Sequence, residues 1–382
     1  MTACPGPQRP GLLFTHRRLT PTMMTTAPPN TNTATVKRPR IVGVDALRVL
    51  CLIAVIFGHT YGAAIEHREF LSMWRMPLFF VLSGYFLTPG KSLRAETNTR
   101  FTTLLVPYFW WSVICSVVTV IWWYHDPKHL TELLIMGWYG GVDQTIIWMA
   151  FWFLSVLTAT VLLYRCLQHL PAWVPWVVAL SGLVLSDILD DELLARTPFS
   201  VGLCLPVLFY ILCGRALHML VHTRLQATIG TERPSTPYAL IGSGLVVAGF
   251  IATALGVPTH SIQSSDFGLF LITPLTGITI SAGFILLSAT WGDRLIRAIP
   301  PMRHWVYQLA RAGTVVVLLH GIVLLQLDRW DLGNLHLRFL LTVVICFAVG
   351  TLLCRLAPRY RWARLLTGMR TPKTSSPRSS VS

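Results

Sequence analysis

Long runs of apolar residues, separated by short polar segments, dominate the chain from residue 41 to residue 356. A bilayer core about 30 Å thick requires roughly 20 apolar residues per spanning helix. Windows of that length predict transmembrane helices near 41–62, 70–88, 102–123, 144–164, 172–188, 198–218, 237–256, 267–289, 305–326 and 336–356. The weakest window is 172–188, which carries Pro175 and ends in Ser186 and Asp187. The pattern predicts an all-α polytopic membrane protein with about ten transmembrane helices.

The basic residues orient these windows. If the N-terminus is cytoplasmic, 23 of the 31 Lys and Arg residues fall in cytoplasmic segments, 6 fall outside, and Arg48 and Arg311 lie within spans. Cytoplasmic loops of membrane proteins carry such an excess of positive charge. Both termini are therefore predicted to be cytoplasmic, in a multi-pass protein of the cell membrane, either a bacterial inner membrane or a plasma membrane.

Composition supports this class and excludes others. Hydrophobic residues make up 53% of the chain and charged residues 12%, whereas a soluble domain is about one-quarter charged. The net charge of +15 is explained by topology and by attraction to anionic lipid headgroups. Nucleic acid is not predicted as a partner, because no basic patch with interleaved aromatic residues is visible. The 8 cysteines show no spacing typical of zinc, so no metal site is predicted.

Three segments follow from the same pattern. Residues 1–39 form a basic arm rich in Thr and Pro, predicted to be disordered, and 40–357 form the membrane domain. Residues 358–382 are predicted to be a basic, disordered cytoplasmic tail. The arm lacks the apolar core of a secretory signal. We hypothesise that the biological start is Met23 or Met24; a native N-terminal peptide beginning at Met1 or Thr2 would refute this.

Arg48 and His59 lie eleven residues apart in an otherwise almost entirely apolar window. Eleven helical steps turn about 1100°, close to three full turns, so both side chains face one way, about 16 Å apart along the axis. Ionisable groups inside a membrane helix are costly and indicate a functional site. The pair predicts a path that crosses the membrane.

The ninth window carries a similar pair, Arg311 and His320, at depths that match those of Arg48 and His59. Nine helical steps turn about 180°. The two side chains therefore cannot face one cavity unless Gly313 distorts the span.

Several motifs resemble the acyltransferase-3 family of integral-membrane acyltransferases. The first window contains RIVGVDALR at 40–48 and IAVIFGH at 53–59, and the second contains MPLFFVLSGYF at 76–86. Arg100 followed by LLVPYFW at 104–110 resembles the start of the family's third helix. WFL at 152–154 and LLH at 318–320 also fit. The matches run in the expected order over most of the membrane domain.

The resemblance implies an O-acyltransferase, an enzyme that transfers groups other than aminoacyl groups. The donor would be a cytoplasmic acyl-CoA, most often acetyl-CoA, and the acceptor a hydroxyl of a sugar, a surface glycan or a small natural product. The family's essential histidine corresponds to His59 and its partner arginine to Arg48. Its third-helix Arg-x-x-Arg motif matches only at Arg100, because Thr103 stands at the second position.

Chemistry supports these roles. An alcohol needs a base to remove its proton, and histidine titrates in the suitable range. CoA phosphates require cations on the cytoplasmic side, for which Arg100 and Arg311 are candidates. The remaining candidates are substrate-binding residues near the expected level of His59 or within the family motifs: His320, Arg75, Ser83, Tyr85 and Trp152.

Each candidate has an alternative interpretation. His59 and His320 could be helix-packing histidines, and Arg48 could pair with Asp45 at i,i+3 spacing. Ser83 could allow close helix approach, and Tyr85 and Trp152 could be core aromatics.

Two other functional classes remain for the whole chain. A secondary transporter would also have about ten spans and buried ionisable groups. The other class is a non-catalytic membrane partner or sensor. Replacing His59 by alanine discriminates, since only an enzyme loses a covalent product.

Overall fold

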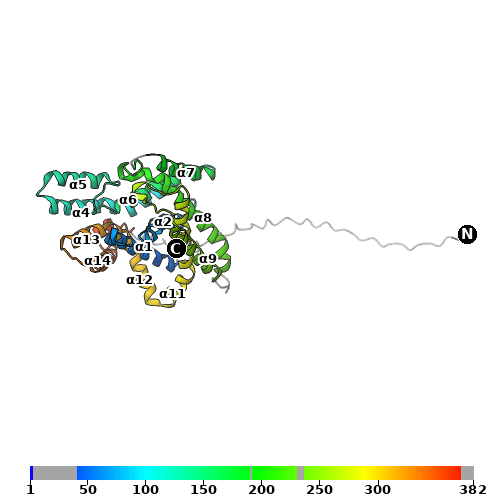
Figure 1. The fold of residues 1–382 in the computed structure, drawn as a ribbon. Helices are drawn as coiled ribbons and strands as arrows, with labels where there is room; N and C mark the ends of the chain where they lie inside the picture. The colour runs from blue at the N-terminus through cyan, green and yellow to red at the C-terminus, as the bar shows by residue number, and fades with distance from the viewer. Residues whose placement is uncertain (3–40, 190–191, 230–235, 371–382) are drawn as a thin grey trace, which may run out of the picture. The chain divides into compact units, whose positions relative to one another are not determined.

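In the computed structural model, residues 1–2, 41–189, 192–229 and 236–370 are described. The predicted arm, apart from its first two residues, and the tail beyond residue 370 lie outside these ranges, as do Met23 and Met24. Within them the chain is all-helical, with a single isolated bridge between Ser261 and Asp266 (Figure 1). The α-helices are α1 Val42–Tyr61, α2 Glu69–Tyr85, α3 Leu93–Arg100, α4 Val106–Trp123, α5 Pro127–Tyr139, α6 Phe151–Leu167, α7 Trp173–Ile188, α8 Cys204–Ile229, α9 Thr236–Ala254, α10 Ile272–Leu287, α11 Asp293–Ala298, α12 Pro300–Arg311, α13 Gly313–Arg329, α14 Leu335–Leu356 and α15 Arg361–Thr367.

Six helices in the described ranges are long and apolar enough to cross a membrane, or up to seven if the bent pair α12–α13 counts as one span. The other predicted windows correspond to α2, α6 and α7, which are 17, 17 and 16 residues long. The predicted window 102–123 belongs to one continuous run, Leu93–Trp123. The structure therefore shows an integral multi-pass helical protein.

Four short helices lie outside the predicted windows: α3, α5 and α11 in predicted loops and α15 in the predicted tail. Helix α5 occupies a predicted loop and begins at Pro127, capped by the Asp126 carboxylate, which accepts from the His129 N–H. Helix α15 lies inside the segment predicted to be an unfolded tail. Its Leu366 carbonyl accepts from the Trp111 indole N–H at 3.0 Å. Hydropathy windows overlook such short helices, because packing against long helices stabilises them.

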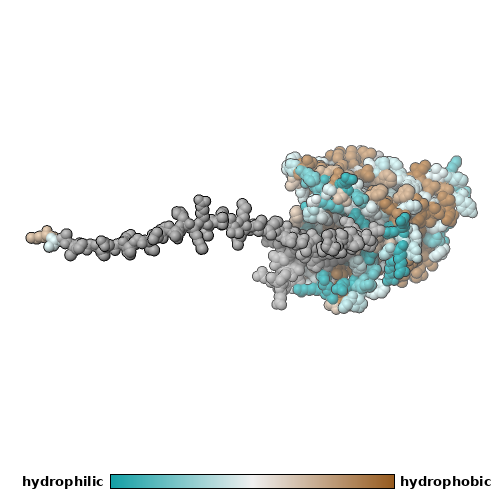
Figure 2. Space-filling view, turned by 180° about the vertical axis from the view of Figure 1, so that it is seen from behind, coloured by the Kyte–Doolittle hydropathy of each residue, from teal (hydrophilic) through white to brown (hydrophobic). Residues whose placement is uncertain are grey.

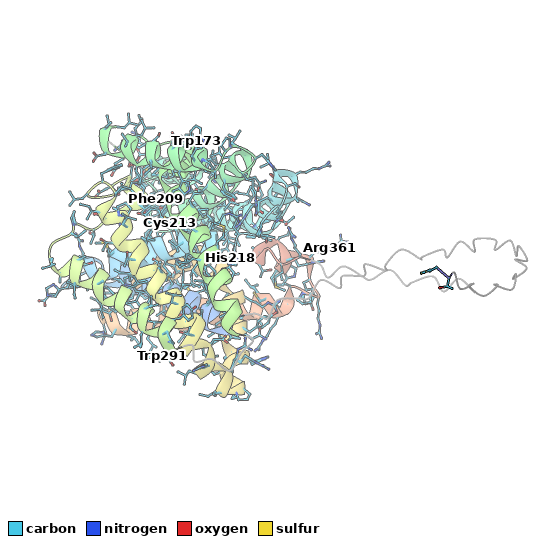
Figure 3. All side chains as sticks on the ribbon, turned by 90° about the vertical axis from the view of Figure 1, so that its right-hand side faces the viewer. Trp173, Phe209, Cys213, His218, Trp291 and Arg361 are labelled. Carbon is cyan, nitrogen blue, oxygen red and sulfur yellow. The ribbon has the colours of Figure 1, made fainter. Side chains whose placement is uncertain are left out.

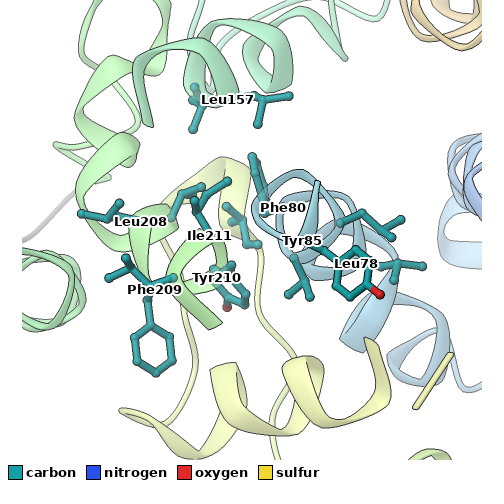
Figure 4. Packing of buried hydrophobic residues seen from close by; sticks show 14 of the residues in the cluster. Leu78, Phe80, Tyr85, Leu157, Leu208, Phe209, Tyr210 and Ile211 are labelled. Carbon is teal, nitrogen blue, oxygen red and sulfur yellow. The ribbon is translucent and has the colours of Figure 1, made fainter. Parts of the chain in front are cut away.

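Helices α1 and α2 lie in the middle of the bundle (Figure 1). Helix α2 packs against α8 and α10, and α8 also packs against α6 and α7. The α2–α8 contact depends on glycine, since a Cβ at Gly84 would lie 2.1 Å from the Ile211 carbonyl oxygen. Buried residues fill this junction, with Phe80 of α2 and Ile211 of α8 beside Leu157 of α6 (Figure 4).

Large hydrophobic side chains are exposed around the bundle, and apolar patches cover much of the face in Figure 2. Figure 3 shows Trp173 on α7 and the sequence Phe209, Cys213, His218 along α8. Contiguous apolar surface on this scale indicates contact with lipid rather than water.

Candidate active site

A cavity of about 470 Å³ lies where the C-terminal part of α1 meets α2, the start of α6 and the loop between α9 and α10. Three of the predicted site residues line it: His59, Arg75 and Trp152. Apolar side chains from the helices complete one wall, among them Phe79, Phe153 and Val317. The cavity is therefore a partly apolar chamber with an imidazole and a guanidinium in its lining.

His320 stands next to His59, with 5.5 Å between the ring centroids. It is buried, and its Nδ1 lies 3.1 Å from the Val316 carbonyl and 2.9 Å from the Val317 carbonyl. Because carbonyl oxygens only accept, Nδ1 carries the proton and Nε2 carries the lone pair. Nε2 is buried and has no hydrogen-bond partner in the described part of the chain. The structure thus brings together two histidines that are 261 positions apart.

Arg75 occupies the space that a side chain at position 58 would fill. A Cβ on Gly58 would lie 1.6 Å from Nη1 of Arg75. The Cys51 thiol donates to the Arg75 carbonyl at 3.1 Å. Nη1 is buried and lacks a hydrogen-bond partner among the described residues. A buried charged N–H group without a partner is costly, so this guanidinium is suited to an electron-rich ligand in the cavity.

The loop between α9 and α10 supplies the polar wall, which the sequence did not predict. Thr259, His260, Ser261, Gln263 and Asp266 all line the cavity. Burial and, to a lesser extent, the nearby positive charge of Arg75 together lower the pKa of His260 from its ordinary value to about 4. A lone histidine in a loop carries no spacing signal, and only the folding of this loop over the cavity reveals it.

Arg48 lies on the same face of α1 as His59 but does not line the cavity. Its Nη1 is 3.5 Å from the Asp45 carboxylate, and its guanidinium lies 4.3 Å from the centroid of the Phe86 ring. In this conformation Arg48 therefore pairs with Asp45 of its own helix, as the alternative interpretation of Arg48 predicts. One helical face can hold both residues, but 16 Å of axial separation prevents them from sharing one chamber.

Ser83 and Tyr85 of α2 also lie outside the cavity lining. The Ser83 hydroxyl donates to the Phe79 carbonyl of its own helix at 2.8 Å. Tyr85 is buried in the core, edge-on to the ring of His218 at 4.9 Å. Their positions correspond to helix packing.

Arg100 belongs to a separate ionic network centred on the buried carboxylate of Glu96. The Arg100 Nε donates to Glu96 at 2.8 Å, Lys91 lies 3.1 Å from it, and Arg165 Nη2 lies 3.2 Å from it. Arg165 also donates to the Thr88 carbonyl and to Gln168. Three cations thus surround one carboxylate, which leaves a local excess of positive charge.

Arg311 ends α12, and the chain bends by 66° between α12 and α13 at this point. Helix α13 starts at Gly313, the residue whose distortion would be needed for Arg311 and His320 to face one cavity. Arg311 does not line the cavity. It lies 5.3 Å from the Tyr307 ring centroid and 3.2 Å from the Met369 sulfur. Arg311 and His320 thus lie on the two helices on either side of the bend.

No group of three or more His, Cys, Asp or Glu side chains that could hold a metal ion occurs in the described ranges. The cavity instead combines an imidazole pair, a buried guanidinium, an apolar wall and a polar loop. An imidazole can move a proton and a guanidinium can stabilise a developing negative charge. This combination suits acyl transfer to a weak nucleophile.

Comparison with known proteins agrees with this chemistry. The model of one protein family, described as an acyltransferase domain, matches residues 41–357, which is well over half of the chain. Neither a curated protein nor a solved structure matches the sequence. The chain therefore belongs to the acyltransferase-3 family and is a membrane acyltransferase that transfers groups other than aminoacyl groups.

Proposed function

We propose that the protein transfers an acyl group, namely acetyl, from a cytoplasmic acyl-CoA to a hydroxyl of a sugar, a surface glycan or a small natural product. The observation that carries this proposal is the position of His59 in the cavity, next to His320 and within electrostatic range of Arg75. A base beside a cationic group is the minimum that O-acyl transfer requires.

In the proposed reaction, His59 takes the proton of the acceptor hydroxyl while the acceptor oxygen forms a bond to the thioester carbon. The carbon–sulfur bond then breaks, and the proton passes from His59 to the leaving thiolate of CoA. His320 supports this step, because its Nε2 lone pair can accept a hydrogen bond from a protonated His59. The neutral tautomer of His320 is fixed by the two backbone carbonyls that Nδ1 contacts.

Arg75 stabilises the negative charge that develops on the thioester oxygen. Its buried Nη1 already lies at the cavity, so little reorganisation is needed when the charge appears. Trp152 and the neighbouring apolar residues exclude water from this point and accommodate the acyl chain. The site therefore combines a base, an oxyanion-stabilising cation and a dry wall.

The donor enters from the cytoplasmic side in this proposal. Seven candidate spans together with the shorter helices α2, α6 and α7 are compatible with ten crossings and with both termini in the cytoplasm. The phosphates of CoA would meet cations at that end, namely Arg48, Arg311 and the positively charged network around Arg100. The pantetheine arm would then carry the thioester towards His59.

The test compares cells that produce the wild-type protein with cells that produce His59→Ala, both fed a labelled acyl precursor. We expect label in one fraction (envelope glycan, lipid or secreted metabolite) that falls about 10²–10⁴-fold in the variant at equal membrane level. His304→Ala, at an exposed position on α12, is the matched control. Equal label in wild type and His59→Ala would exclude His59 from the chemistry.

A further inference from the structure

The cavity has two chemically different walls. The helices contribute mainly apolar side chains, among them Leu52, Val55, Phe79, Trp152, Phe153 and Val317. The loop between α9 and α10 contributes hydroxyl, imidazole, amide and carboxylate groups from Thr259, His260, Ser261, Gln263 and Asp266. An acyl chain suits the first wall. The second wall offers both hydrogen-bond donors and acceptors, as a polyhydroxylated molecule requires.

The loop is held in a defined conformation. Ser261 and Asp266 exchange backbone hydrogen bonds of 2.9 and 3.2 Å, and Ser265 between them has a left-handed φ of 61°. Thr273 joins the two ends of the loop, since its hydroxyl donates to the Pro258 carbonyl and accepts from the Leu269 N–H. The buried side chain of Ile262 anchors the segment. The polar wall is therefore pre-organised rather than formed around a ligand.

His260 is the most deeply buried polar side chain of this wall, with 6% of its surface exposed. Its ring packs against α10, where a Cβ on Gly277 would lie 3.2 Å from Cε1, and stands edge-on to Tyr210 at 6.3 Å. Both ring nitrogens are buried and have no hydrogen-bond partner in the part of the chain that the structure describes. The side chain nevertheless lines the cavity.

An unsatisfied buried polar group costs about 1–3 kcal/mol. A histidine that served packing alone at this position would therefore destabilise the fold. Neutral imidazole offers one N–H donor and one lone pair, the same two functions that a hydroxyl offers in return. The low pKa of His260 keeps the ring neutral near pH 7. Its hydrogen-bonding capacity is thus available to a ligand that fills the cavity.

We propose that residues 259–266 form the acceptor-selecting wall of the site and that His260 hydrogen-bonds a second hydroxyl of a polyhydroxylated acceptor. This inference rests on the proposed acyl transfer. The reacting hydroxyl lies at His59, and the second hydroxyl lies at His260, with Arg75 within electrostatic range of both rings. His260 is a binding residue that orients the acceptor, and the proton transfer remains with His59.

The test uses membrane vesicles from cells that make both the full-length protein and its native acceptor, with acetyl-CoA labelled in the acetyl group. Two products are followed: label bound to non-CoA material, which measures transfer, and free labelled acetate, which measures loss of the acetyl group to water. Wild type, His59→Ala, His260→Leu and His260→Asn are compared, with His304→Leu as the matched control at an exposed site.

Wild-type transfer that depends on His59 establishes the reaction itself; without it, acyl transfer and this inference both fail. Given that transfer, we expect His260→Leu to lower the ratio of transfer to hydrolysis by about tenfold, with the KM for acetyl-CoA changed little. His260→Asn should recover part of the ratio, because an amide also donates and accepts. An unchanged ratio in His260→Leu, or an equal loss of both products, would overturn the acceptor role.

Discussion

Two regions differ in how their buried polar groups are paired: the ionic network around Glu96 and the cavity lined by His59. In the network, Nη1 and Nη2 of the buried Arg165 donate to Glu96, to the Thr88 carbonyl and to Gln168, while its Nε has no partner among the described residues. Glu96 also contacts Lys91 and Arg100. At the cavity, Nη1 of Arg75 and the ring nitrogens of His260 are buried without partners among the described residues. In the network, opposite charges pair with one another across helices, whereas at the cavity unpartnered polar atoms belong to residues that line it, where a substrate can use them.

This difference predicts opposite signs for the effect of removing charge. The largest effect is expected for Glu96→Ala, which leaves Arg165 buried and uncompensated and should lower the free energy of unfolding by about 3–5 kcal/mol. Thermal unfolding of the detergent-solubilised protein measures the loss. Glu192→Ala is the matched control, because Glu192 pairs with a half-exposed Arg196 at 3.9 Å and its loss should cost at most about 1 kcal/mol. Equal losses in the two variants would contradict a structural role for the network.

At the cavity, Arg75→Gln should behave in the reverse manner. Removal of the guanidinium should lower acyl transfer by about 10²-fold or more, because charge stabilisation at the reacting oxygen is lost. The unfolding temperature should stay the same or rise, since a mostly buried charge whose Nη1 has no partner among the described residues is removed. Measuring the transfer rate and the unfolding temperature of the same variant shows whether the role of Arg75 is functional or structural. A variant that loses both together would place Arg75 among the structural residues.

Gly58→Ala tests the same guanidinium without changing its charge. The new Cβ would occupy the place of Nη1, so the flexible Arg75 side chain must move, and we expect about a tenfold loss of transfer from its displacement. Gly244→Ala on α9 is the matched control, because nothing lies within 4 Å of a Cβ there. It should leave transfer unchanged and stabilise the helix by about 0.5–1 kcal/mol. Full activity in Gly58→Ala would mean that the position of Arg75 does not matter.

The smallest effect concerns pH. His260 titrates near 6.5 when unfolded and at about 4 in the fold. As the pH falls below 6.5, His260 binds a proton in the unfolded chain but not in the folded chain, so the free energy of unfolding decreases. Between pH 7.5 and 5.5 this loss amounts to about 1 kcal/mol. His260→Gln lacks it, so its unfolding temperature should fall less than that of the wild type over this interval. Identical falls would mean that His260 does not remain neutral in the folded protein.

Much of the architecture was predictable, because apolar runs of about 20 residues have few stable alternatives to membrane helices. The longer helices occur where these runs predicted them, although α2, α6 and α7 are shorter than a full span. The short helices α3, α5, α11 and α15 were not expected. The sequence suggested a bend at Gly313 only as the condition under which Arg311 and His320 could face one cavity, and the chain does bend between α12 and α13. Short helices and bends depend on neighbouring helices, which a local pattern does not contain.

The sequence by itself determined the class of the protein and indicated His59 as the candidate chemical group, because an ionisable residue inside a membrane helix is costly and therefore indicates a functional site. Only the tertiary structure decided which other residues join it. The ring of His320 contacts that of His59, and Arg75 and Trp152 line the same cavity as His59. The other predicted site residues lie outside the cavity lining: Arg48, Arg100, Arg311, Ser83 and Tyr85. His260 enters from a loop with no distinguishing pattern. Helical periodicity fixes the direction of a side chain along one helix, but contacts between distant segments arise only when the helices pack.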